Sequence, residues 1–399
     1  WFLFYGSAAI GLYVIAVYGL TLRSLQVQRR IRRSGWEEGE PVEVTLHMQT
    51  RSILPMCWGI VRDLCYAEGA SEPIAHQQFR FAPAGWNRFE FAYRLEGLPR
   101  GRYRFGPTGL VTGDLFGLVT KTKWAEDETA FDVYPKPLDP GPLLVSAGGG
   151  LSAPVAGGGW GRAGVELAGT VREYVRGDPY NRIHWRSSAR TGDWKTLVPE
   201  PEGQPLVWIV LDAGAYPRYE DGEKDAGTSF LAANLGSMPD ERASGFETAV
   251  RLAAGLMQRA ADQGREAMLL IAGDMPQTVR LAGNRGRREA LRLLAGVRPG
   301  GWEPAGEQAR ALERAAARMR SGDSVVCVSA ACCEDWSAFI RRILSRRVRC
   351  DLLLATPESA LMPFERRAVN ELAKLGCGVR YYPDGRAQQR DGEGGMRYA

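Results

Sequence analysis

The sequence lacks the residue patterns of the common enzyme classes. Only three histidines occur among 399 residues, and His47, His76 and His184 lie in different predicted regions. There is no G-x-S-x-G nucleophile motif. There is also no G-x-x-x-x-G-K-[ST] phosphate loop, and the glycine-rich stretch at 148–159 has no helix signal directly after it. We therefore predict that the chain is not an enzyme.

Paired cysteine motifs and clustered basic charge are also lacking. The seven cysteines are an odd number and lack the paired C-x-x-C spacing of zinc sites. Cys327 and Cys350 lie in apolar, strand-like runs, where a free cysteine behaves as a small hydrophobic residue. This favours reduced thiols in the cytoplasm. The formal net charge of +5 is small for this length and the arginines are scattered, so we expect no nucleic-acid partner.

Charged residues are absent from the first 22 positions. About 20 uncharged, mostly apolar residues are enough to span a bilayer as a helix. A signal peptide normally carries basic residues before its apolar run, whereas here they follow it, at Arg23, Arg29, Arg30, Arg32 and Arg33. The positive-inside rule then places the later residues in the cytoplasm. We predict a protein of the cell membrane with one visible transmembrane helix and a cytoplasmic bulk.

From residue 40 the apolar residues recur with a period of two. Val42, Val44 and Leu46 alternate with polar residues, and the pattern returns from Phe89 to Leu95. Such alternation is typical of strands with one buried face. Several short strands over about 100 residues, separated by Gly-Pro turn signals, predict a small antiparallel β-sandwich-like domain.

The C-terminal half alternates between apolar runs and helical spacing. The runs 206–211, 268–271, 325–328 and 352–354 are continuously apolar, as expected for parallel strands that are buried on both faces. Segments with helical periodicity lie between them. This order predicts a doubly wound α/β domain.

The segment 169–202 connects these two regions and contains a predicted short helix. Asp178 is a suitable N-cap and Gly192 a suitable C-cap. Between them, Arg182, Arg186 and Arg190 recur every fourth residue and share one helix face, while Ile183, Trp185 and Ala189 are expected to face a core. Two interpretations of the arginines stay open: an internal ion-pair lattice with nearby carboxylates, or a docking surface for an acidic partner.

This segment resembles the signature of domain-of-unknown-function family 58. The resemblance rests on matching positions that include Asp178, Arg182, His184, Trp185, Arg190 and Glu200. Arg100-Gly101-x-Tyr103 and Asp114-Leu115-Phe116-Gly117-Leu118 resemble the family's sandwich-like region. The resemblance implies a membrane anchor, often a pair of close-set helices, and a von Willebrand factor A-like domain. It also implies a MoxR-type AAA+ ATPase as partner.

Together these observations predict a multidomain α/β plus β protein. Its expected parts are a transmembrane helix (1–22), a basic juxtamembrane segment (23–38), a β-sandwich-like domain (39–137), a Gly/Pro/Ala-rich linker (138–168), the signature segment (169–202), a doubly wound von Willebrand factor A-like α/β domain (203–385) and a disordered tail (386–399).

An A-like domain raises the question of a metal site. Asp212 and Asp274 each follow a predicted strand, where ligands bind in open α/β sheets. The metal-binding motif of such domains is Asp-x-Ser-x-Ser, but here Gly214 and Tyr216 replace the two serines. Thr248 lies near the position where a threonine ligand would be expected. We expect a degenerate site with no cofactor, and we keep weak Mg²⁺ binding as the alternative.

The predicted function is that of a membrane-anchored cytoplasmic scaffold or adaptor. Its interaction residues are expected in the signature segment: Asp178, Arg182, His184, Trp185, Arg186, Arg190 and Glu200. Its expected partner is the MoxR-type AAA+ ATPase. The alternative function is a metal-dependent binding protein or hydrolase that uses Asp212 and Asp274.

Overall fold

The computed structural model describes residues 1–398 except for positions 34, 55, 83–86, 142–168, 176–182, 200–204, 215–239, 301–305, 321, 333, 347, 384–387 and 391–395. The described residues form two compact units. The first contains the N-terminal helix, the β-sandwich, most of helix α4 (Asp240–Asp262) and helix α5 (Gly283–Gly296). The second contains the signature segment and the parallel sheet.

Helix α1 (Phe2–Leu20) is long and apolar enough to cross a membrane, and nearly all of it is exposed. It ends at Thr21, whose amide donates to the carbonyl oxygen of Val17. The helical part of the predicted span at 1–22 is thereby confirmed.

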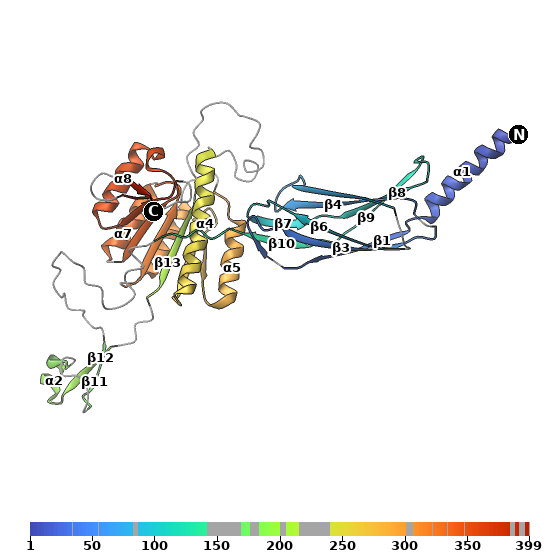
Figure 1. Ribbon diagram of the computed structural model, residues 1–399. Coiled ribbons are helices and arrows are strands. Elements are labelled where there is room, and N and C mark those ends of the chain that lie inside the picture. Colours follow the sequence, from blue (N-terminus) through green and yellow to red (C-terminus); the bar gives the residue numbers. More distant parts are fainter. Residues whose placement is uncertain are drawn as a thin grey trace. The chain divides into compact units, whose positions relative to one another are not determined.

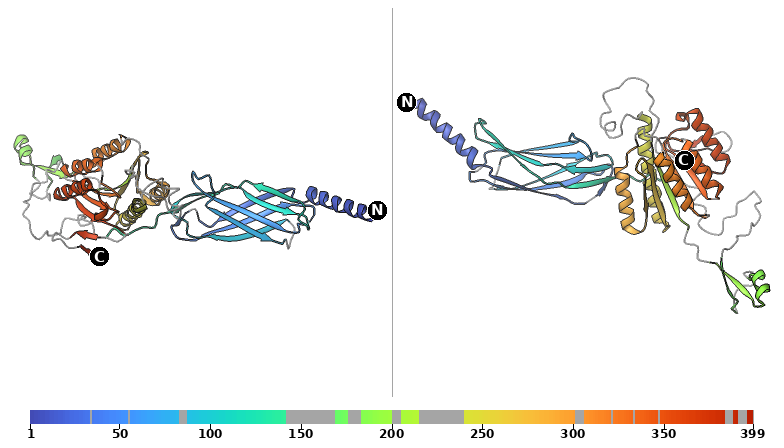
Figure 2. Two further views of the ribbon diagram at one scale, coloured as in Figure 1. Left: turned by 90° about the horizontal axis from the view of Figure 1, so that it is seen from above. Right: turned by 180° about the vertical axis from the view of Figure 1, so that it is seen from behind.

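The sandwich consists of two facing sheets (Figures 1 and 2), whose strands pair antiparallel except for the parallel pair of β2 and β10. The smaller sheet has the order β1 (Ser24–Ile31), β3 (Val42–Arg51), β6 (Arg88–Leu95). The larger has the order β2 (Gly35–Glu37), β10 (Ala130–Tyr134), β7 (Gly101–Phe105), β4 (Gly59–Ala67), β8 (Thr108–Gly113), β9 (Thr120–Ala125), and β5 (Ala75–Phe81) pairs with β4. Both sheets contribute to the core: Val44 and Leu95 of the smaller sheet pack with Phe105 and Phe131 of the larger.

The sandwich begins earlier than the sequence predicted. Strand β1 occupies half of the predicted juxtamembrane segment 23–38 and pairs with β3 over its whole length. Arg29 is therefore not a juxtamembrane cation. Its side chain is buried, pairs with Asp63 at 2.7 Å and lies over the ring of Phe105. Counting charges along the chain could not reveal this pairing across strands.

Arg100 ties the sandwich to the helices of the first unit. Its guanidinium binds both carboxylate oxygens of Glu247 on α4, at 2.6 and 2.7 Å. It also donates to the carbonyl oxygens of Leu294 and Val297, at 2.8 and 2.9 Å, at the end of α5. All of these are charge-assisted hydrogen bonds to a planar donor group, the arrangement in which arginine binds most strongly.

The parallel sheet of the second unit has the order β15 (Gln277–Arg280), β14 (Ala267–Gly273), β13 (Val207–Ala213), β16 (Ser324–Ser329), β17 (Arg349–Leu354), β18 (Gly378–Tyr381), β19 (Gln388–Arg390), β20 (Met396–Tyr398). Strands β14, β13, β16, β17 and β18 are parallel. The winding direction reverses at β13, which makes the sheet doubly wound. The predicted fold class is confirmed.

Burial explains why these strands could be found in the sequence. Every residue of β13, β14 and β16 is buried. On one face, Trp208 and Val210 pack with apolar residues of three helices, α6 (Gly306–Arg318), α7 (Glu334–Ser345) and α8 (Pro363–Lys374). The predicted disordered tail at 386–399 is wrong in part, because β19 and β20 extend the sheet beyond β18. The predicted linker at 138–168 lies almost entirely outside the described residues.

Candidate functional site

The signature segment folds as a strand pair with a short helix between the strands. Strands β11 (Gly169–Glu173) and β12 (Lys195–Pro199) pair antiparallel. Helix α2 (Trp185–Thr191) begins later than predicted, because Ile183 forms an extended bridge with Thr196 and His184 is the N-cap. The prediction of Gly192 as C-cap is confirmed by its φ of 81°. Asp178, Arg182 and Glu200 lie outside the described residues.

His184 and Ser188 fix helix α2 on strand β12. The Nδ1 atom of His184 accepts from the Ser187 amide at 3.1 Å, and the Ser187 hydroxyl lies 2.6 Å from the same nitrogen. The buried Ser188 hydroxyl donates to the carbonyl oxygen of His184 and accepts from the Lys195 amide, at 3.1 and 2.9 Å. The His184 amide in turn donates to the Lys195 carbonyl at 2.8 Å. His184 is therefore a capping residue of a braced helix.

The outer side of this segment carries two exposed tryptophans and two exposed arginines. Trp185 is 65 % exposed and Trp194 is 52 % exposed, and the ring of Trp194 packs edge-on against Tyr174. Arg186 and Arg190 are also exposed. We call Trp185, Arg186, Arg190 and Trp194 the Trp–Arg surface. Trp185 and Ala189 were expected to face a core, and that prediction is wrong.

The ion pairs of the described residues bear on the two interpretations of the arginines. Among the residues that the structure describes, neither Arg186 nor Arg190 forms an ion pair. The lattice interpretation thus has no support at these two positions, and the docking interpretation keeps both guanidiniums available. Trp194 was missed by the sequence reasoning, although its place directly after the turn at Gly192 could have drawn attention to it.

A second cluster lies at the carboxyl end of β13. Asp212 is buried and its carboxylate is fully engaged. Its Oδ1 accepts from the Gly214 amide at 3.0 Å and from the Gln308 side-chain amide at 2.8 Å. Its Oδ2 accepts from the Ser329 hydroxyl at 2.6 Å. We call these four residues the Asp212 cluster; Gln308 and Ser329 come from α6 and the end of β16 and were not predicted.

Burial raises the pKa of Asp212 from 3.8 to about 6, and the hydrogen bonds from its neighbours offset only part of that rise. A carboxylate that holds a hard cation needs lone pairs directed at the ion. Here both oxygens already face protein donors.

The glycine of the degenerate motif explains this arrangement. A Cβ added at Gly214 would lie 2.4 to 2.7 Å from the amide group of Gln308. The glutamine thus fills the space that a serine side chain would need. The donors around Asp212 do not fit a divalent cation, and they match the alternative in which Asp212 caps a loop amide.

The other two predicted ligands are Asp274 and Thr248. Asp274 is exposed in the bend that follows β14. Thr248 is a buried residue of α4. Within the described part of the chain, no group of three or more His, Cys, Asp or Glu side chains is placed to hold a metal ion.

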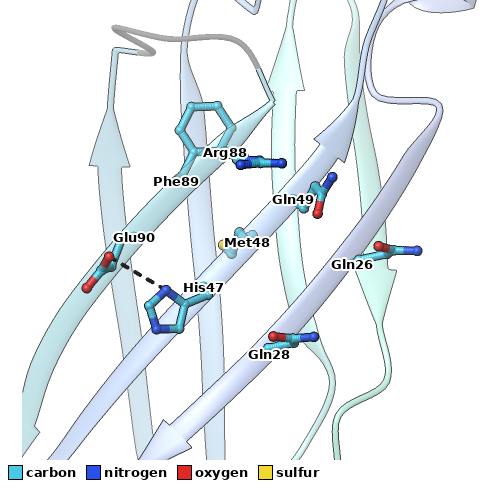
Figure 3. A pocket seen from close by; sticks show the side chains of 8 residues that line it. All are labelled: Gln26, Gln28, His47, Met48, Gln49, Arg88, Phe89 and Glu90. Atoms are coloured by element: carbon cyan, nitrogen blue, oxygen red, sulfur yellow. Dashed lines mark ion pairs between the residues drawn. The ribbon is translucent and has the colours of Figure 1, made fainter.

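A pocket of about 370 Å³ lies on the outer face of the smaller sandwich sheet. Its lining includes Gln26, Gln28 and Gln49, together with His47 and Glu90, which form an ion pair at 3.6 Å (Figure 3). Gln28 lies beside His47 on the neighbouring strand, whereas Gln26 and Gln49 lie apart from that pair (Figure 3). The lining therefore offers no assembled set of catalytic groups.

A known protein family matches the region of the chain that contains the Trp–Arg surface and the Asp212 cluster. Residues 170–367 match the family described as "Protein of unknown function DUF58". The chain belongs to the DUF58 family. The resemblance of the signature segment to that family is thereby confirmed.

This DUF58 chain is also similar to "Uncharacterized protein YeaD" from Bacillus subtilis (strain 168), with 27 % identity over 232 residues. That match covers 55 % of this chain and 56 % of the relative, so the chain spans about half the length of the curated relative.

Two solved structures each resemble part of this DUF58 chain. The von Willebrand factor type A protein from Catenulispora acidiphila is 14 % identical, with 48 % of this chain and 40 % of that chain covered and a TM-score of 0.29. The CARDB domain of PF1109 from Pyrococcus furiosus is 14 % identical, with 29 % and 92 % covered and a TM-score of 0.20. The assignment of the doubly wound α/β fold rests on the strand order of the parallel sheet and not on these two similarities.

Proposed function

We propose that this DUF58 protein is a membrane-anchored cytoplasmic adaptor that binds a protein partner through the Trp–Arg surface. The observation that carries the proposal is the exposure of Trp185, Arg186 and Arg190 on a braced helix, with Trp194 exposed just after the turn that ends the helix. Tryptophan and arginine are the residue types most enriched among binding hot spots. A rigid helix also loses little conformational entropy on binding.

The proposed partner is a MoxR-type AAA+ ATPase that presents an acidic patch. The charge of the Trp–Arg surface supports an acidic partner, because Arg186 and Arg190 have no ion pair among the described residues. Unpaired guanidiniums favour a carboxylate partner because they bind its two oxygens in a bidentate geometry. The choice of a MoxR-type ATPase follows from the family resemblance, which implies this partner for DUF58 proteins.

Membrane anchoring is supported by helix α1, with 19 residues of high hydropathy and little burial. Exposed basic residues after the helix, including Arg23 and Arg30, support a cytoplasmic location for the sandwich. In this proposal the sandwich holds the α/β domain near the membrane, and the chain performs no catalysis. The Asp212 cluster then has a structural role at the end of the sheet.

The test is capture of the purified MoxR-type ATPase from the same organism by the full chain in nanodiscs. Arg186→Glu should abolish capture and leave the melting curve measured by circular dichroism unchanged. Arg285→Glu reverses an exposed arginine on α5 and serves as the matched control, with capture retained. Loss of the folded state in Arg186→Glu would instead indicate an internal lattice, and unchanged capture would refute the docking surface.

A further inference from the structure

The turn between β8 and β9 presents apolar side chains to solvent. Leu115, Phe116 and Leu118 are 66, 66 and 64 % exposed. Three large apolar residues on one tight turn are unusual for a surface in water, where contiguous apolar patches mark interaction sites. We call these three residues the β8–β9 tip.

The β8–β9 tip is held rigidly by Asp114. One carboxylate oxygen accepts from the Val119 amide at 2.7 Å and the other from the Phe116 amide at 3.0 Å. These backbone hydrogen bonds, led by that from Val119, lower the pKa of Asp114. The Trp58 indole donates to the Asp114 carbonyl at 2.9 Å. The turn is thus braced with its apolar side chains outward.

The tip lies beside helix α1, within the same unit (Figure 1). The rings of Phe116 and Tyr13 pack edge to face at 6.3 Å between centroids. On β9, the Lys121 ammonium donates to the carbonyl oxygens of Tyr18 and Thr21, at 2.8 and 2.9 Å. It also lies 5.2 Å from the centre of the Tyr18 ring. Lys121 therefore satisfies carbonyls at the end of α1 and fixes the helix to the strand.

The contact between Phe116 and Tyr13 sets how far along α1 the β8–β9 tip lies. Tyr13 precedes the last residue of α1 by two turns, about 10 Å at 1.5 Å per residue. Cations surround the foot of the helix instead: Arg23, Arg51 and Lys123 are exposed there, and the Arg23 amide donates to the Arg51 carbonyl. An apolar tip above a band of cations matches the layers of an anionic membrane interface.

We propose that the β8–β9 tip enters the lipid bilayer beside α1, with acyl chains around Leu115, Phe116 and Leu118. Anionic headgroups then face Arg23, Arg51 and Lys123. The sandwich is thereby attached to the membrane at two points rather than one, so it cannot swing freely about the end of α1. This inference rests on the proposed membrane anchoring by α1.

The experiment measures the depth of a fluorescent label on the full chain. The chain is reconstituted in vesicles of phosphatidylcholine and phosphatidylglycerol, in a Cys57→Ser, Cys333→Ser background. A polarity-sensitive dye is attached to Phe116→Cys, and separately to Leu118→Cys in case the first variant does not fold. Ile10→Cys on α1 reports insertion of the helix, and Glu96→Cys on an exposed turn of the sandwich is the matched control.

Both tip labels should emit at shorter wavelength and lose intensity when lipids carry a quenching doxyl group on the acyl chain, as should the label at Ile10. The label at Glu96 should do neither. Quenching at Ile10 with the tip labels in water would overturn the inference and leave the anchor intact. Tip labels that are shielded from water but not quenched by lipid would show that protein covers the tip and would also overturn it. An unquenched Ile10 label would overturn both the anchor and the tip.

Discussion

The Gln308 side-chain amide donates a 2.8 Å hydrogen bond to Asp212 from the space that a serine at position 214 would occupy. The two residues are 96 positions apart in sequence. An amide donor thus stands where the metal-binding motif of A-like domains has a hydroxyl ligand. This relationship gives a structural reason for the glycine in the degenerate motif, and it can be tested in several ways.

The first prediction concerns the fit between residues 214 and 308. Gly214→Ser should lower the free energy of unfolding by about 1–3 kcal/mol, because the new side chain overlaps the Gln308 amide. Gln308→Ala in the same chain should restore part of that loss. Urea denaturation of the two single variants and the double variant, analysed as a double-mutant cycle, measures this coupling. Strictly additive effects would show that the two side chains do not compete for this space.

The second prediction concerns pH. The folded-state pKa of Asp212 is about 6, above its ordinary value of 3.8. Folding therefore favours the protonated carboxyl, and this contribution is fully present below about pH 4 and is lost as the pH rises through 6. A rise from 3.8 to about 6 corresponds to about 3 kcal/mol. Asp212→Asn should remove this part of the pH dependence between pH 4 and 7 in urea denaturation. An equal slope in both proteins would contradict the assignment to Asp212.

The third prediction concerns divalent cations. Calorimetric titration of the wild-type chain with Mg²⁺ or Mn²⁺ should show no saturable binding at Asp212, since both carboxylate oxygens face protein donors. Asp212→Ala is the control. Saturable binding that disappears in this variant would establish the alternative function, a metal-dependent site built on a degenerate motif.

The fourth prediction concerns the ion pair between Arg100 and Glu247. Arg100→Ala should destabilise the protein by about 3–5 kcal/mol, because it leaves a largely buried carboxylate without its partner. The exposed pair of Arg33 and Glu40, at 3.7 Å, is the matched comparison. Arg33→Ala should change the free energy of unfolding by about 0–1 kcal/mol. Similar losses in the two variants would refute the structural role of Arg100.

Much of the α/β domain could be predicted from the sequence, for a physical reason. Its strands are buried on both faces, so their residues form continuous apolar runs that short-range patterns reveal. The apolar α1 and the glycine that ends α2 are local signals of the same kind. The parts that were missed depend on residues that are distant in sequence, such as the pairing of Arg29 with Asp63 and of Asp212 with Gln308.

The start of α2 shows how tertiary structure overrides local preference. The predicted helix includes Ile183, yet Ile183 pairs with Thr196 in an extended conformation and the helix begins at Trp185. The prediction that Trp185 faces a core was wrong for a related reason. Helical spacing indicates which residues share a face, but it does not say whether that face is covered by protein.

The most direct test of the proposed function is the affinity of the full chain in nanodiscs for the purified MoxR-type AAA+ ATPase, measured by surface plasmon resonance. Trp185→Ala should weaken binding by about 30-fold, the effect of a hot-spot residue that contributes at least 2 kcal/mol. Trp124→Ala removes a tryptophan of similar exposure on β9 and should leave the affinity unchanged. Equal affinities of the wild type and Trp185→Ala would contradict the assignment of partner binding to the Trp–Arg surface.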